Sequence, residues 1–208
     1  MTDYYKYKRT FHLPWSPGST NDDKMLTDTS SFKGKSIVVT EKMDGENTNM
    51  YPDRIHARSI DSSDHISRHW VKSLWGNIRH EIPTGWRICG ENLYARHSIY
   101  YDQLPSFFMV YSIWDEKNMR LSWADTLVMC ECLHLIPVRE MYRGIFDEEY
   151  LKNLKIDRKI QEGYVIRNKE EFHYDDFSEN VAKWVRPAHV ITGDHWMFQE
   201  VFPNKLKI

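Results

Sequence analysis

Cysteine is scarce in this sequence, with three among 208 residues. Cys89, Cys130 and Cys132 are too few, and odd in number, for a disulfide framework or a four-ligand zinc site. Cys130 and Cys132 also lie two positions apart in an expected helix, where their side chains point to different faces. We therefore expect Cys130 and Cys132 to be core or partly buried thiols.

Long apolar runs are also absent. The longest strongly apolar stretch, residues 107–114, is far shorter than the ~20 residues that span a membrane. The start of the chain, MTDYYKYKRTFHL, lacks the apolar core of a secretory signal. We therefore expect a protein of the cytoplasm.

Neither sign of charge is in large excess. The sequence has 28 Lys and Arg against 30 Asp and Glu, which gives a formal net charge of -2. This balance excludes the strong global field of many nucleic-acid or membrane binders. Any site for a polyanion must be a local basic patch on a near-neutral protein.

The sequence does contain enough apolar material for a core. Hydrophobic residues make up 41% and aromatic residues 14% of the 208 residues, which excludes a largely disordered chain. No segment repeats at a fixed period or is of low complexity. We expect one domain over residues 1–208.

Short apolar runs predict the strands. They lie at residues 36–40, 86–89, 107–113, 164–167 and 181–185. Residues 13–24, LPWSPGSTNDDK, are rich in turn formers and predict a surface loop. Because the strands interleave with helices without a regular βαβ alternation, the pattern predicts an α+β fold built on antiparallel sheets.

A first helix is predicted over residues 64–80, with Asp64 as its N-cap. Its apolar residues recur at helical spacing, and its other side carries Arg68, Lys72 and Arg79. That side is either an ordinary solvated face or a surface for nucleic acid.

A second helix is predicted from Ser122, with Asp125 three residues later as in a capping box. It must end before Pro137, because proline cannot continue a helix.

The segment EKMDGENTN, residues 41–49, directly follows the apolar strand 36–40. It places Lys42 at a strand end, before the turn formers Asp44 and Gly45. A lysine amine is nucleophilic only when deprotonated, so its pKa must be lowered by burial or by nearby cations. An ordinary Lys-x-Asp-Gly turn is the alternative for this segment taken alone.

Further polar motifs follow in a fixed order. They are Gly90-Glu91, the aromatic strand 107–115, EGYVIR at 162–167, and Lys183 with Arg186 in VAKWVRP. This order and spacing resemble the covalent nucleotidyltransferase superfamily of ATP- and NAD-dependent polynucleotide ligases and mRNA-capping guanylyltransferases. Within it, the sequence looks most like the phage-type RNA ligases, because Glu41 precedes Lys42 and Asn47 lies five residues beyond it.

The resemblance implies a fold and an extent. It implies an antiparallel-sheet, ATP-grasp-like nucleotidyltransferase (adenylylation) domain. Because few residues follow Arg186, we expect no C-terminal OB domain. NAD-dependent ligases carry an additional N-terminal element, so ATP is the expected nucleotide.

The resemblance also implies roles for residues around the first motif. Lys42 would attack the α-phosphorus of ATP and hold AMP as a phosphoramidate. Glu41 would contact the adenine amino group, and Asn47 a metal-bound water. Arg58 would lie near the ribose or the α-phosphate. The alternatives are turn capping for Glu41 and Asn47, and an exposed surface position for Arg58.

The later motifs complete the expected site. Glu91 would bind the ribose hydroxyls. Tyr111 would stack on the adenine, with Phe108 as the competing choice. Glu162 would bind the divalent metal, Mg²⁺ or Mn²⁺. Lys183 would neutralise the α-phosphate.

The last motif departs from the family pattern. Many of these ligases have two lysines one residue apart, whereas here Arg186 is three positions after Lys183. Residues i and i+3 of a strand do not share a face, so Arg186 contributes only if the strand bends. For His189 and His195, which lie further along the chain, we favour a structural role over a phosphate contact.

The expected function is an ATP-dependent RNA ligase that joins 5′-phosphate and 3′-hydroxyl ends through a covalent lysyl-AMP and an adenylylated 5′ end. The expected partners are RNA and, to prepare or grip its ends, a kinase-phosphatase. Two alternatives stay open: a minimal DNA ligase with the same chemistry, and a non-catalytic nucleotide- or RNA-binding module of the same fold.

Overall fold

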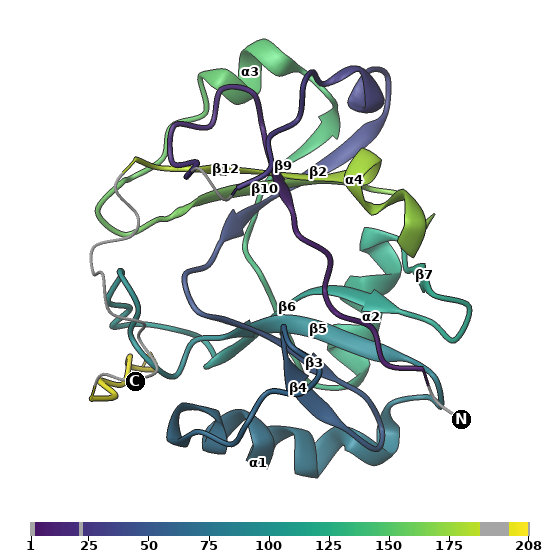
Figure 1. Ribbon diagram of the computed structural model, residues 1–208, viewed down its shortest axis with the longest axis vertical. Helices are drawn as coiled ribbons and strands as arrows, with labels where there is room; N and C mark the ends of the chain where they lie inside the picture. Colours follow the sequence, from purple (N-terminus) through teal and green to yellow (C-terminus); the bar gives the residue numbers. More distant parts are fainter. Residues whose placement is uncertain (1–2, 21–22, 188–199, 208) are drawn as a thin grey trace.

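Two β-sheets form the centre of the computed structural model, which describes residues 3–20, 23–187 and 200–207 (Figure 1). The strands of the first sheet, in order, are β1 (Phe11–His12), β12 (Val181–Val185), β10 (Gly163–Asn168), β2 (Ser36–Lys42) and β9 (Glu140–Ile145). Only the short β1–β12 pairing in this sheet is parallel.

The second sheet lies below the first in Figure 1. Its strands, in order, are β11 (Phe172–His173), β7 (Met119–Arg120), β6 (Phe108–Trp114), β5 (Arg87–Asn92), β3 (Glu46–Met50) and β4 (Ile55–Ala57). The short strand β8 (Ile136–Pro137) pairs in parallel with β6, and the other pairings are antiparallel.

Helices cover the outer faces of the two sheets. In Figure 1, α3 (Glu148–Lys152) lies above the first sheet and α1 (His69–Ile78) below the second. The other helices are α2 (Trp123–Cys132), α4 (Phe177–Asn180) and the 3-10 helices η1 (Ser30–Phe32), η2 (Ile66–Arg68), η3 (Arg79–Glu81) and η4 (Tyr174–Asp176). The expected α+β class with mainly antiparallel sheets is confirmed.

The apolar residues of β2 show why both of its faces are covered. Ile37 and Val39 pack into a core on the outer side of the first sheet, whereas Val38 packs into the core between the two sheets. Successive side chains of a strand point to opposite faces, so a continuous apolar run fits a strand buried on both sides.

The chain crosses from the first sheet to the second between β2 and β3. Lys42 ends β2, and Glu46 begins β3. A Cβ atom at Gly45 would overlap the carbonyl oxygen of Asn92 on β5, so only glycine allows this close approach. The Lys-x-Asp-Gly turn is therefore the connection between the sheets, and it leaves Lys42 at their junction.

The predictions for regular elements were largely correct. Each predicted strand is present; β12 has the predicted ends, and the ends of the other four differ by one to three residues. α2 begins after the predicted N-cap Ser122, whose Oγ accepts a hydrogen bond from the Asp125 N–H at 3.1 Å. All three cysteines are free thiols, and Cys130 is buried as expected. The expectation was wrong for Cys132, which is exposed because residues two apart in α2 point to different faces.

Two predictions around the first helix were wrong. Asp64 is not its N-cap, because the chain enters α1 through the 3-10 turn η2, which His65 caps. Arg68 does not lie on an exposed face. It is buried and forms an ion pair with Glu46 of β3, because the η2 turn rotates it toward the second sheet.

The predicted surface loop 13–24 was also partly wrong. Leu13 is fully buried, and Ser16 is buried as well. The N–H of Gly18 donates to the carbonyl of Val185 at 3.0 Å, so this segment packs along the end of β12. In the described part of the chain, no helix has the length and apolar character needed to cross a membrane.

Candidate active site

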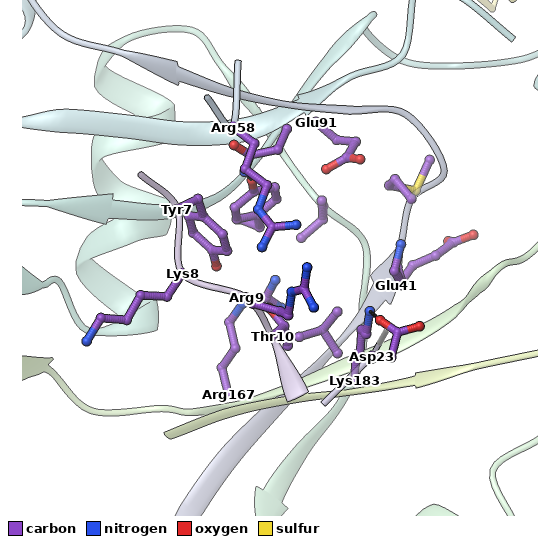
Figure 2. A pocket seen from close by; sticks show the side chains of 16 residues that line it. Tyr7, Lys8, Arg9, Thr10, Asp23, Glu41, Arg58, Glu91, Arg167 and Lys183 are labelled. Atoms are coloured by element: carbon purple, nitrogen blue, oxygen red, sulfur yellow. Dashed lines mark hydrogen bonds and ion pairs between the residues drawn. The ribbon is translucent and has the colours of Figure 1, made fainter. Parts of the chain in front are cut away.

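A pocket of about 260 Å³ lies between the two sheets, beside the turn that joins them (Figure 2). The predicted site residues that line it are Glu41, Lys42, Asn47, Arg58, Glu91, Tyr111 and Lys183. They come from five strands and one loop, so folding brings together residues that are distant in the sequence. Glu162 and Arg186 are not part of the lining.

Lys42 and Glu162 form an ion pair at one end of the pocket. The Lys42 Nζ atom lies 2.5 Å from Glu162 Oε2, and the Glu162 side chain is 6% exposed. Antiparallel pairing of β2 with β10 places Gly163 opposite Lys42, which brings Glu162 beside it. Glu162 therefore contacts the predicted nucleophile directly.

The carboxylates around Lys42 keep its side chain charged. Burial acts to lower the pKa of the Lys42 ammonium, but Glu162, Glu91 and Asp44 outweigh burial and raise it above the ordinary value. Burial in turn raises the pKa of Glu162, although Lys42 opposes the shift. These charges favour the ammonium form of Lys42, which is not nucleophilic.

Glu91 lies opposite Asn47 in the pairing of β5 with β3. Its Oε1 atom accepts a hydrogen bond from the Gly45 N–H at 3.2 Å. Burial, together with the negative charges of Glu162 and Asp44, raises the pKa of Glu91 to about 8, although Lys42 acts to lower it. A neutral carboxyl group at this position can both donate and accept hydrogen bonds.

Tyr111, not Phe108, reaches the pocket. Phe108 is fully buried on the opposite face of the second sheet, against the core under α1. Between Gly90 and Cys89 the pairing shifts from Val110 to Ser112, which leaves Tyr111 as the extra residue of a β-bulge. The Asn47 side-chain amide donates a hydrogen bond to the Tyr111 hydroxyl, which ties β3 to β6.

Glu41 and Arg58 lie at the pocket with different neighbours. The Glu41 carboxylate accepts a hydrogen bond from Arg139 Nε at 2.8 Å. Burial lowers the pKa of Arg58, and the nearby cation Arg9 adds to that shift. Figure 2 shows Arg9, Arg58 and Arg167 pointing into the same space, which makes this part of the pocket suited to an anion.

The two basic residues of the last motif lie apart, with Lys183 at the pocket and the Arg186 side chain near Ser98. Lys183 lines the pocket and lies 3.4 Å from Asp23. The backbone N–H of Arg186 donates to the Glu162 carbonyl at 2.9 Å, whereas its side chain reaches Ser98 Oγ at 3.5 Å. Arg186 therefore does not join Lys183 on the pocket wall. His189 and His195 lie outside the described residues.

Several pocket residues were missed by the sequence analysis. Tyr7, Lys8, Arg9 and Thr10 line it from an N-terminal segment that passes between the sheets, and Asp23, Met43, Val138, Val165 and Arg167 complete the wall. Alternation along β10 from Gly163 could have identified Val165 and Arg167, which point to the same side. No local pattern marked the N-terminal segment, because its position depends on long-range packing.

In the described residues, few side chains are arranged to hold a metal ion. None of them form a group of three or more His, Cys, Asp or Glu side chains arranged to hold an ion. Mg²⁺ and Mn²⁺ held against a nucleotide need only one or two protein carboxylates, because phosphate oxygens and waters supply the remaining ligands. Glu162 fits such a role by chemistry and place.

Comparison with curated protein sequences finds no match. Solved structures with the same fold include the Naegleria gruberi RNA ligase with pyrophosphate, at 18% identity and a TM-score of 0.52, covering 76% of this chain and 51% of that chain. Two variants of that ligase, one with AMP and Mn and one with ATP and Mn, are each 14% identical with TM-scores of 0.51. The match to the variant with AMP covers 76% of this chain and 51% of that chain. The match to the variant with ATP covers 88% of this chain and 61% of that chain.

At these low sequence identities, the structural similarity shows a shared fold alone, and this chain spans about half the length of the first of these ligases. The sequence itself provides the family evidence. The family model of RNA ligases matches residues 35–185, from the start of β2 to the end of β12, and this range contains Lys42, Glu91, Glu162 and Lys183. The chain therefore belongs to the RNA ligase family.

Proposed function

We propose that this chain is an ATP-dependent RNA ligase in which Lys42 is the nucleophile. The observation that carries the proposal is the position of Lys42 at the junction of the two sheets, in a pocket that also holds Glu91, Tyr111 and Lys183. Each of these residues also belongs to one of the sequence motifs described above. A binding module would not need a lysine paired with a buried carboxylate at the end of the pocket.

The proposed reaction has three displacements at phosphorus. Lys42 Nζ, after losing a proton, attacks the α-phosphorus of ATP, and the bond from that phosphorus to the bridging oxygen breaks to release pyrophosphate. A 5′-phosphate oxygen of RNA then attacks the lysyl-AMP and frees Lys42. Finally, the 3′-hydroxyl attacks the adenylylated 5′-phosphate, and AMP leaves as the phosphodiester forms.

The side chains that line the pocket are suited to the adenine, the ribose and the phosphates of ATP. The Tyr111 ring and Val165 provide apolar surface for the adenine, with Glu41 at the edge for its amino group. Glu91 has the hydrogen-bonding capacity to hold ribose hydroxyls. Lys183 and Arg58 provide positive charge for the phosphates, which is the main form of catalysis in phosphoryl transfer. Asn47 is the candidate to bind a water beside them.

A divalent cation, Mg²⁺ or Mn²⁺, belongs at Glu162 in this proposal, and it would supply positive charge to neutralise the phosphates. Two of the Naegleria gruberi RNA ligase structures described above contain Mn, one together with AMP and the other with ATP. Release of Lys42 from Glu162 would remove the main cause that raises its pKa, so burial would then favour the neutral amine.

The proposed substrate is RNA with 5′-phosphate and 3′-hydroxyl ends. A kinase-phosphatase that produces such ends is the class of partner that this reaction requires. A DNA ligase with the same lysine chemistry is the alternative that the family match disfavours.

The test is sealing of nicked duplexes that carry RNA or DNA on the 3′-hydroxyl side. We expect the RNA nick to be sealed at least about tenfold faster, a difference of ~1.4 kcal/mol in activation free energy. Lys42→Ala should seal neither nick, and Lys159→Ala, at an exposed lysine, should match the wild type. Equal sealing of both nicks would contradict the proposed preference for RNA. No sealing by a folded wild type would contradict the proposed ligase activity.

A further inference from the structure

Asp23 brings a negative charge to the wall of a pocket that otherwise suits phosphate. Its Oδ1 atom lies 3.4 Å from Lys183 Nζ, and Figure 2 shows the two side chains beside each other. Asp23 was not among the residues that the sequence patterns or the family resemblance identified. Its position therefore needs a separate explanation.

Two hydrogen bonds from Thr20 hold the Asp23 carboxylate, and His12 lies beside it. Its Oδ2 atom accepts hydrogen bonds from the Thr20 N–H at 3.1 Å and the Thr20 hydroxyl at 3.0 Å. Its Oδ1 atom faces His12 Nε2 at 3.3 Å. Hydrogen bonds from Thr20 and the Lys183 charge outweigh burial and lower the pKa of Asp23, so the group is a fixed anion.

His12 is itself held in place. It is fully buried, and its Nδ1 atom lies 2.8 Å from Ser16 Oγ. Because Ser16 Oγ accepts the Val185 N–H at 2.9 Å, its own hydrogen can point to His12 Nδ1. His12 Nε2 lies 3.3 Å from Asp23 Oδ1, but the two atoms do not form a hydrogen bond with each other.

Residues 13–20 with Asp23, here called the N-terminal strap, are attached to the strand that carries Lys183. The Leu13 N–H donates to the Lys183 carbonyl at 2.8 Å, and the Gly18 N–H donates to the Val185 carbonyl at 3.0 Å. The strap therefore moves with β12, and Asp23 keeps a fixed relation to the Lys183 backbone.

Lys183 depends on this anion for its position. It is the only lysine or arginine of β12, because the position two residues later is the buried Val185 and the Arg186 side chain reaches Ser98 instead. A lysine side chain has four rotatable bonds and holds no fixed direction without a partner. Burial and the charge of Lys42 lower the pKa of Lys183, and Asp23 opposes both.

We propose that Asp23 is a positioning residue that holds the Lys183 ammonium at the place where the α-phosphate of ATP is transferred. The proposal rests on the proposed function. Lys183 has three N–H donors, so it can keep one on Asp23 and direct the others to phosphate oxygens. Since the two hydrogen bonds from Thr20 hold Asp23 without help from Lys183, the carboxylate stays when the nucleotide enters.

The test combines Asp23→Asn with Lys183→Met in a double-mutant cycle. The measured quantity is the single-turnover rate of lysyl-AMP formation at saturating ATP. We expect Asp23→Asn to lower this rate at least about tenfold, and to lower it less than about twofold in the Lys183→Met background. The dissociation constant for ATP, measured in proteins that also carry Lys42→Ala, should change less than about threefold.

Two further variants control for folding and for charge. Asp28→Asn removes an exposed carboxylate that does not line the pocket, and it should match the wild type. Thr20→Val removes one of the hydrogen bonds that orient Asp23, and it should give an intermediate loss of rate. Unfolding midpoints of all variants establish that each one is folded.

The outcomes separate this proposal from the proposed function. A wild-type rate in Asp23→Asn, or an equal loss with and without Lys183, would overturn the positioning role and indicate that Asp23 acts independently. A weakened ATP affinity with an unchanged saturating rate would also overturn it. Failure of the folded wild type to form lysyl-AMP would instead contradict the proposed function on which the inference rests.

Discussion

The Lys42 ammonium and the Glu162 carboxylate lie 2.5 Å apart, so the candidate nucleophile at the pocket wall and the candidate metal ligand beside it form an ion pair. This ion pair stabilises the protonated, unreactive form of Lys42. A divalent cation bound at Glu162 would compete with Lys42 for this carboxylate, so it would lower the pKa of Lys42 and favour the free amine. The state of Lys42 therefore depends on what occupies the pocket.

Glu162→Gln should lower the pKa of Lys42 in the nucleotide-free protein. The amide removes the largest influence that raises this pKa, while burial still acts to lower it. We expect Lys42 to react faster with an amine-directed acylating reagent near neutral pH, as quantified by peptide mass analysis. Glu148→Gln, in an exposed pair with Lys152, should leave Lys42 reactivity unchanged. Equal reactivity of Lys42 in Glu162→Gln and the wild type would contradict this account.

Glu91→Gln should stabilise the protein at alkaline pH. The pKa of Glu91 is about 8 in the folded protein, above its value in the unfolded chain, so the folded state binds more protons between those two values. The contribution of Glu91 to the free energy of unfolding therefore falls as pH rises toward 8.

The corresponding measurement is urea unfolding of wild type and Glu91→Gln from acid to alkaline pH. We expect the stability difference to grow as pH rises and to reach about 1–3 kcal/mol by pH 8, a value reduced because the Glu91 side chain is only partly buried. A difference that stays constant with pH would show that Glu91 does not titrate in this way.

Tyr111→Ala should weaken ATP binding. Stacking of a base on an aromatic ring contributes ~1–3 kcal/mol, which corresponds to a loss of roughly five- to 150-fold in affinity. Binding is measured in proteins that also carry Lys42→Ala, so that ATP is not consumed. Tyr111→Phe keeps the ring and should retain most of the affinity.

Phe108→Ala is the contrasting variant, because Phe108 is fully buried on the other side of the sheet. It should lower the free energy of unfolding by about 3–5 kcal/mol and have no specific effect on ATP affinity in the folded fraction. Loss of stability with Tyr111→Ala but unchanged ATP affinity would assign Tyr111 to the core only.

Gly163→Ala and Gly76→Ala should change stability in opposite directions. A Cβ atom at Gly163 would overlap the Trp184 carbonyl of β12, so alanine must push apart β10, which Glu162 directly precedes, and β12, which carries Lys183. At Gly76, in the exposed face of α1, a Cβ atom meets nothing within 4 Å.

Urea unfolding measures both effects. We expect Gly76→Ala to stabilise the protein by up to about 1 kcal/mol, because alanine has the higher helix propensity. Gly163→Ala should destabilise it by at least about 1 kcal/mol. A neutral Gly163→Ala would mean that β10 and β12 are not packed as closely as described.

The site was predictable where short motifs determine it. Lys42 follows an apolar strand and precedes a turn, and this local pattern placed it correctly at a strand end. Strand alternation could also have favoured Tyr111 over Phe108, because these residues are three positions apart and point to opposite faces. The same rule correctly separated Arg186 from Lys183.

The remaining features depend on contacts between distant segments. Arg68 appeared to lie on the charged side of a helix, but an ion pair with Glu46 and a 3-10 first turn place it inside the protein. Asp23 belongs to a segment whose composition predicted only a loop, and its position comes from hydrogen bonds to β12. Neither relation has a signature in the local sequence.

The most direct test of the central claim is whether Lys42 forms a covalent bond to AMP. Wild type, Lys42→Ala and Lys159→Ala are each incubated with α-labelled ATP and Mg²⁺ or Mn²⁺, then analysed by denaturing gel and by mass spectrometry of peptides. We predict one AMP on Lys42 in the wild type and in Lys159→Ala, and none in Lys42→Ala. A folded wild type that forms no adduct with either metal, or an adduct that persists in Lys42→Ala, would contradict the account.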